Sequence, residues 1–252
     1  MTPLRQAVDF LVDGDFVERV HTGDDDFGFV PTVLGMVTGR LMVSPTVCHR
    51  LREVLSSIDV PKTADDAERQ LIDVLAEHVP KLSHAAVSEA LESRVLHLKW
   101  AHGFIDRGHD ELEAQAHSGA ETAAYLPGDL ARAAMLAVAN SPNAFRRDAR
   151  TIGGVPYATM SAVLGEAPRY LHWLSCQGFL ATVHPWVAIV AADLSRRIRW
   201  RRCQPPRGSG RLLWMCEQMA TAAHADDVVP MLWAAATTRF AALFVLPRGL
   251  RR

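Results

Sequence analysis

The sequence lacks the short motifs by which catalytic and metal sites are usually found. Its four cysteines stand far apart and form no C-x-x-C pair, which argues against a zinc ribbon or a disulfide framework. No G-x-S-x-G marks a nucleophilic serine, and RGSGR at 207–211 lacks the G-K-[S/T] of a phosphate-binding loop. These absences favour a non-enzymatic function, for which no cofactor is expected.

The chain also lacks an apolar run of the kind that a leader or a membrane span requires. Its first residues, MTPLRQAVDFLVDGDF, carry acids where a signal peptide needs an apolar stretch. Residues 228–247 are mostly apolar, but Pro230 interrupts them and Arg239 would be costly in hydrocarbon. The pattern therefore predicts an amphipathic helix, no membrane partner, and a cytoplasmic location (the interior of the host cell for a viral protein).

Lysine is scarce, and charge is unevenly divided. The net charge is −1, yet residues 1–145 hold 22 Asp and Glu against 12 Lys and Arg, whereas residues 146–252 hold 6 against 15, all of them Arg. This asymmetry predicts an acidic helical part, 1–145, and an Arg-rich helical part, 146–252, either separate or within one continuous domain. The second part would need an acidic partner: nucleic acid, another polyanion or the chain's own first part. Codon bias of a GC-rich genome would also enrich arginine.

Helix signals dominate the rest of the chain. Ser44-Pro45 and Thr63 are typical helix starts, and AERQLIDVLAEHV repeats apolar residues at three- and four-residue steps. Residues 27–43 are β-branched and punctuated by glycine, which predicts a loop and a short β-hairpin around Thr38-Gly39. The expected fold is mainly α: a multi-helix globular protein with a possible short β-hairpin near residues 27–43.

The stretch TIGGVPYATMSAVLGEAPRYLHWL, residues 151–174, predicts an extended start, a helix at 158–164, a turn at Gly165 and a second helix at 168–177. It resembles the small C-terminal module of exonuclease-X-type proteins, which also occurs in phage and viral proteins. The resemblance covers about 25 residues, and the module's lysines are replaced here by Gly154, Pro156 and Ala158. It implies a small fold, a nucleic-acid association and a phage or viral setting, but no nuclease activity. The matching motif residues are Gly153, Pro168, Tyr170, Leu171, Trp173 and Leu174.

Residues 159–179 are also compatible with a helix-turn-helix whose second helix would read DNA. That helix offers Arg169, His172 and Gln177 as polar contacts, but most of its other residues are apolar. The competing hypothesis is that Tyr170, Leu171, Trp173 and Leu174 simply pack a core.

The basic stretch SRRIRWRRCQPPRGSGR is the stronger chemical signal. Its arginines could contact phosphates and its tryptophan could stack on an exposed base. Favourable interaction with a helix C-terminus, or pairing with the acidic first part, would explain the same residues. The candidate nucleic-acid-binding residues are Arg196, Arg197, Arg199, Trp200, Arg201, Arg202, Arg207 and Arg211.

A metal site is a minor alternative. The His109-Asp110 pair resembles that of metal-dependent HD phosphohydrolases, with Asp129 as a further ligand. One His-Asp pair is nearly expected by chance in a chain with 11 histidines. No catalytic residue is therefore assigned beyond this alternative.

The sequence thus favours a non-enzymatic protein that binds nucleic acid or acts in a nucleoprotein assembly. The first alternative is an assembly or adaptor protein whose copies join head to tail through their acidic and basic parts. The second is a metal-dependent phosphohydrolase of the HD type.

Overall fold

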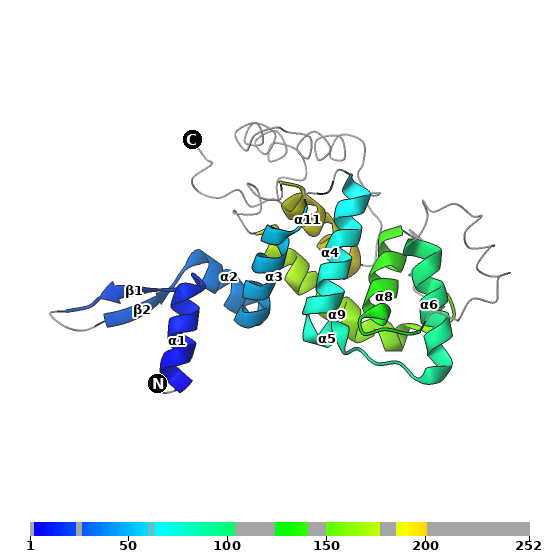
Figure 1. The fold of residues 1–252 in the computed structure, drawn as a ribbon, viewed down its shortest axis with the longest axis horizontal. Coiled ribbons are helices and arrows are strands. Elements are labelled where there is room, and N and C mark those ends of the chain that lie inside the picture. The colour runs from blue at the N-terminus through cyan, green and yellow to red at the C-terminus, as the bar shows by residue number, and fades with distance from the viewer. Residues whose placement is uncertain are drawn as a thin grey trace.

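The computed structural model describes residues 3–23, 27–59, 61, 63–103, 124–140, 150–176 and 185–200. Its elements are α1 (Pro3–Asp13), β1 (Val17–His21), β2 (Phe27–Pro31), α2 (Val33–Leu41), α3 (Pro45–Ser57), α4 (Ala64–His78), α5 (Pro80–Ser83), α6 (Glu89–Gly103), α8 (Asp129–Asn140), β3 (Thr151–Ile152), β4 (Val155–Pro156), α9 (Tyr157–Ser175) and α11 (Pro185–Trp200). The prediction of a mainly α-helical fold with a short hairpin is confirmed (Figure 1). None of the helices within these ranges is long and apolar enough to cross a membrane.

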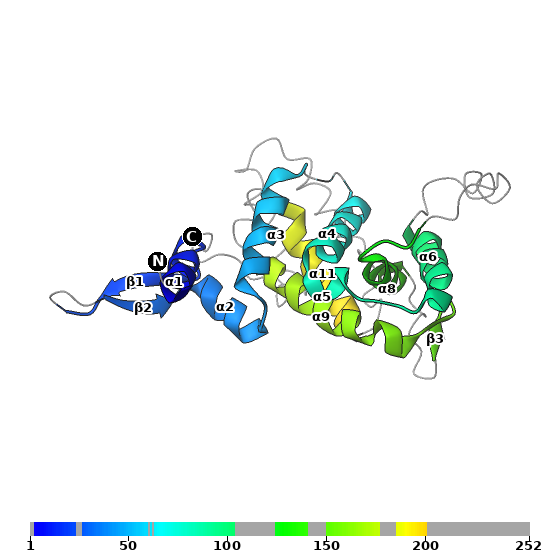
Figure 2. The same cartoon turned by 60° about the horizontal axis from the view of Figure 1, so that its bottom comes forward.

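Helices α4, α8, α9 and α11 form the centre of the molecule. Their inward faces supply the largest buried side chains, among them Leu75, Met135 and Trp173. Figure 2 shows α9 running along the molecule from the β3–β4 hairpin toward α2 and α3, with α11 beside it. Described residues on both sides of position 145 share one hydrophobic core.

The N-terminal hairpin stands at one end of the molecule, away from α6 and α8 (Figure 1). Strands β1 and β2 pair antiparallel from Val17 with Pro31 to His21 with Phe27. The predicted turn at Thr38-Gly39 is wrong, because those residues lie within α2. Thr32 is the reason: its hydroxyl accepts a hydrogen bond from the backbone N–H of Gly35, 3.0 Å away, and so begins a helix where the sequence suggested a strand.

A second, smaller hairpin leads into α9. Ile152 pairs with Val155, and the two residues between them, Gly153 and Gly154, have φ angles of 55° and 79°. Two-residue hairpin turns of this kind need positive φ, which glycine adopts without steric cost. Gly153, one of the predicted motif residues, therefore has a structural role here.

Helix α9 continues through its expected break. The predicted turn at Gly165 is wrong, as is the helix-turn-helix that depended on it, because residues 157–175 form one helix with Pro168 inside it. A proline in a helix interior costs about 3 kcal/mol. Burial of Leu164, Ala167 and Leu171 around it offsets that cost, since each such side chain contributes on the order of 1–3 kcal/mol.

Two glycines of α2 allow a matched test of how closely this helix packs against Phe16. A Cβ at Gly35 would lie 1.9 Å from the backbone oxygen of Phe16, whereas a Cβ at Gly39 would meet nothing within 4 Å. We expect Gly35→Ala to lower the free energy of unfolding by about 1–3 kcal/mol through overpacking. Gly39→Ala should leave it unchanged or raise it by up to about 1 kcal/mol, because alanine favours helix. Urea denaturation measures both, and equal stabilities would contradict this packing.

Candidate nucleic-acid interface

The last turns of α11 point their arginines in two opposite directions. Arg196 and Arg199 are exposed and lie three residues apart, so they share one face of the helix. Arg197 faces the core and is 1% exposed. Neither Arg196 nor Arg199 forms an ion pair within the described ranges. The cluster that looked uniform in sequence is therefore divided into an outward pair and an inward arginine.

Arg197 was predicted to contact phosphate, and its position in the structure contradicts that prediction. Its guanidinium is buried and binds the carboxylates of Glu68 on α4 and Asp193 on α11. It also donates to the backbone oxygen of Ala139 at the end of α8, 2.8 Å away. Because its donors are engaged inside the protein, Arg197 does not reach a phosphate in this structure. The Asp193–Arg197 spacing of four residues was a visible signal for this pairing.

The two carboxylates around Arg197, those of Glu68 and Asp193, are buried and therefore poorly solvated. Burial raises the pKa of Asp193, more than the neighbouring Arg197 lowers it, and the charge of Glu68 raises it further. A raised pKa means that ionised Asp193 is less favourable in the folded protein than in the unfolded chain. Arg197 is the compensating charge that keeps both carboxylates tolerable in the core.

Contacts between α9 and α11 bring a second pair of basic groups to the outward arginines. The Ser195 hydroxyl donates to the backbone oxygen of Pro168, 2.8 Å away, which seats the end of α11 against this part of α9. Arg199 then lies close enough to His172 to lower its pKa, an effect that adds to the larger one of partial enclosure of the ring. His172 and Arg169 lie three residues apart on α9. We call Arg169, His172, Arg196 and Arg199 the basic surface.

Two acids moderate this surface, and the first, Asp193, lies close enough to Arg196 for that arginine to lower its pKa. Glu166, one turn before Arg169 on α9, forms ion pairs with Arg169 and with Lys81 of α5, the latter at 3.5 Å. The pairs leave one net positive charge among these three groups. Sequence reasoning placed Arg169 and His172 in a recognition helix and missed their proximity to α11, which depends on tertiary packing.

The apolar motif residues of α9 pack the core, as the competing hypothesis expected. Tyr170, Leu171, Trp173 and Leu174 are all buried. The indole N–H of Trp173 donates to the hydroxyl of Thr38 on α2 at 2.8 Å. The Tyr170 hydroxyl accepts from the backbone N–H of Ser44 at 3.4 Å. The segment that resembled a nucleic-acid module thus fastens the N-terminal elements to the helical centre.

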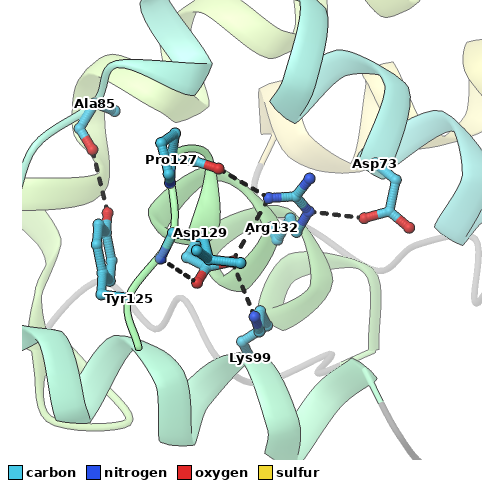
Figure 3. A network of polar contacts seen from close by, with 8 residues as sticks. Asp73, Ala85, Lys99, Tyr125, Pro127, Asp129 and Arg132 are labelled. Atoms are coloured by element: carbon cyan, nitrogen blue, oxygen red, sulfur yellow. Dashed lines mark hydrogen bonds and ion pairs between the residues drawn. The ribbon is translucent and has the colours of Figure 1, made fainter. Parts of the chain in front are cut away.

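Asp129 has a structural role instead of the metal-ligand role considered for it. Its carboxylate is 1% exposed and binds Lys99 at 2.9 Å and Arg132 at 3.5 Å. It also accepts a hydrogen bond from the backbone N–H of Leu126 (Figure 3). Arg132 continues the network to Asp73 on α4, so the group joins α4, α6 and α8. Among the described residues no three His, Cys, Asp or Glu side chains are placed to hold a metal ion.

Several predicted residues cannot be placed. The Trp200 side chain and the residues Arg201, Arg202, Arg207, Arg211, His109 and Asp110 lie outside what the structure describes. Their assigned roles remain predictions.

Comparison with known proteins gives no relative. No family model, curated protein or solved structure matches this chain. The resemblance of residues 151–174 to the exonuclease-X-type module therefore stays a prediction.

Arg196 and Arg197 are adjacent in sequence and opposite in environment, so they make a matched pair of variants. Arg197→Met should lower the free energy of unfolding by about 3–5 kcal/mol, because it leaves two buried carboxylates without a cation. Arg196→Met should change it by less than about 0.5 kcal/mol. Chemical denaturation at neutral pH measures both.

The pH dependence checks the cause of the Arg197→Met deficit. The loss should shrink as the pH falls toward about 4, because protonation discharges Asp193, whose pKa is already raised by burial. A deficit that is constant with pH would contradict the ionic explanation and indicate a packing defect.

Proposed function

We propose that the protein binds nucleic acid through the basic surface on α9 and α11, without catalysis. The observation that carries the proposal is the position of Arg199, which is exposed, lies beside a second basic group, His172, and has no acidic partner in the described ranges. The ring of His172 is neutral at pH 7, so the charge of Arg199 is the one that a ligand on this surface would meet there. A phosphate backbone supplies an anion for this charge.

The chemistry of the side chains suits this ligand. The planar fork of arginine matches phosphate oxygens in a bidentate way, and the exposed heads of Arg196 and Arg199 are available for it. Backbone phosphates carry no sequence information, so binding through these groups would be general and not sequence-specific. In sequence, Trp200, Arg201 and Arg202 follow directly and extend the same proposal along the chain.

Head-to-tail assembly through opposite charges has less support. Glu68, an acid of the first part, is already paired within one chain with Arg197 of the second part. Internal pairing therefore accounts for a part of the charge asymmetry that first suggested such an assembly.

Salt dependence of binding tests the proposal. Fluorescence anisotropy of labelled single- and double-stranded DNA and RNA would be measured across a salt series, with the Arg196→Ala/Arg199→Ala variant for comparison. If both arginines contact phosphate, the slope of log K against log salt should flatten by about 1.4–1.8 units.

Arg40→Ala/Arg150→Ala is the control, because it removes two exposed arginines that lie elsewhere. It should leave the slope unchanged. Absence of binding to every probe at low salt would overturn the proposed function. Equal slopes for the two double variants would show that nucleic acid does not bind at this surface.

His172 predicts a second, pH-dependent signature. Its lowered pKa keeps the ring neutral at pH 7, and protonation at lower pH adds a positive charge beside Arg199. Binding of a phosphate should therefore strengthen as the pH falls from 7 to about 5. His172→Gln should remove this rise and keep the affinity at pH 7. An unaltered pH profile in the variant would place His172 away from the ligand.

A further inference from the structure

A buried carboxylate lies beside the basic surface. The side chain of Glu166 is 9% exposed, and it forms ion pairs with Arg169 on the same helix and with Lys81 on α5. Both cations are more exposed than the acid, at 31% for the Arg169 side chain and 73% for that of Lys81. The acid is therefore enclosed by the protein, whereas the two cations that it binds are accessible to a ligand.

This arrangement is the reverse of the one at Arg197. There a single guanidinium, itself 1% exposed, binds two carboxylates and a backbone oxygen, so its donors face the interior. At Glu166 a single carboxylate binds two cations that face outward. The first arrangement joins helices, and the second leaves one positive charge that the acid does not balance.

The two cations converge on one point and have donors to spare. Arg169 and Lys81 bind the same oxygen of Glu166, Oε2, so their charged heads lie close together. A guanidinium carries five N–H donors and an ammonium three, which is more than one carboxylate oxygen can accept. The Lys81 pair is also loose, with 3.5 Å between Nζ and Oε2. A phosphate can therefore bind both heads while they remain near Glu166.

The charge of Glu166 acts on an anion bound at this point. Because the carboxylate is enclosed, water and salt screen it less than they screen a surface acid. Its effect on a neighbour on α9 is visible: the pKa of Tyr170 is raised mainly by burial, and the charge of Glu166 raises it further while that of Arg169 lowers it. A phosphate at these cations thus meets repulsion from the acid as well as attraction from its two partners.

We propose that Glu166 is an internal competitor of the phosphate ligand: it shares Arg169 and Lys81 with the bound nucleic acid and thereby limits the affinity. The inference rests on the proposed function. It adds Lys81, on a third element, to the phosphate contacts of α9 and α11. Contacts weakened in this way favour dissociation and rebinding along a nucleic-acid chain, as suits binding that does not depend on base sequence.

Glu166→Gln tests the proposal, because glutamine keeps the size of the side chain and an acceptor oxygen but removes the charge. Anisotropy with labelled single- and double-stranded DNA and RNA should show binding about fivefold tighter at about 0.1 M salt. The slope of log K against log salt should steepen by about 0.7–0.9 units for each cation that gains a full phosphate contact. Glu166→Asp keeps the charge and should give neither change.

Lys81→Ala, made in the Glu166→Gln protein, checks that the gain depends on the cations of this cluster. It should flatten the slope by about 0.7–0.9 units, the contribution of one phosphate contact. An unchanged slope would show that the gain arises elsewhere and would overturn the proposal. Circular dichroism and urea denaturation establish that each variant is folded.

Asp9→Asn is the matched control. Asp9 also pairs with an exposed arginine, Arg19, at 2.8 Å, and the pair lies at the end of the molecule that carries the N-terminal hairpin (Figure 1). The substitution changes the net charge by the same amount and should leave binding unchanged. Equal affinity gains for Asp9→Asn and Glu166→Gln would overturn the proposal in favour of a general charge effect.

Two further outcomes separate this inference from the proposed function. If the wild-type protein binds and the Arg196→Ala/Arg199→Ala variant has a flatter slope, the proposed function holds. In that case unchanged binding by Glu166→Gln overturns only the competitor, and weaker binding shows that Glu166 positions Arg169 for the ligand. If the wild-type protein binds none of the probes at low salt, both proposals are overturned.

Discussion

One buried guanidinium holds together the elements on which the basic surface depends. Arg197 binds carboxylates from α4 and α11 and a carbonyl at the end of α8, so three of the four central helices meet at its side chain. Burying charges is costly, and pairing them does not make the cost disappear. What the arrangement provides is a fixed position: once Arg197 is inward, its neighbours Arg196 and Arg199 are directed outward by helix geometry. Arg197 thus sets the positions of Arg196 and Arg199, the two proposed phosphate contacts, although it is itself buried and does not contact phosphate.

The general form of the protein could be predicted from sequence, and its surfaces could not. Capping residues and apolar periodicity located most helices, because those signals are local. The same signals cannot say which of several consecutive arginines turns inward, since that depends on an acid 129 residues earlier in the chain. The prediction of a break at Gly165 was wrong for a related reason. Local preference for a turn was weaker than the burial of α9 on its neighbours.

Residues 3–42, which form α1, β1, β2 and α2, and the four central helices are stabilised in different ways. The centre combines a large apolar core with buried ionic groups at Arg197 and Asp129. Residues 3–42 join that core through buried Phe16, through partly buried side chains such as Leu34, and through the hydrogen bond from Trp173 to Thr38. Regions with few buried contacts open at lower free energy than the core of a protein.

The two-glycine turn between β3 and β4 has a consequence for the angular setting of α9. Each residue along a helix turns by about 100°, so the point at which the chain enters α9 decides which side chains face inward along its whole length. The hairpin fixes this entry by its pairing of Ile152 with Val155 and by the bond from Arg94 to the Gly154 oxygen. Loss of one residue from the turn would rotate the helix by one position and bring His172 into the buried place that Leu171 occupies. The core and the basic surface would fail together, although neither contains a residue of the turn.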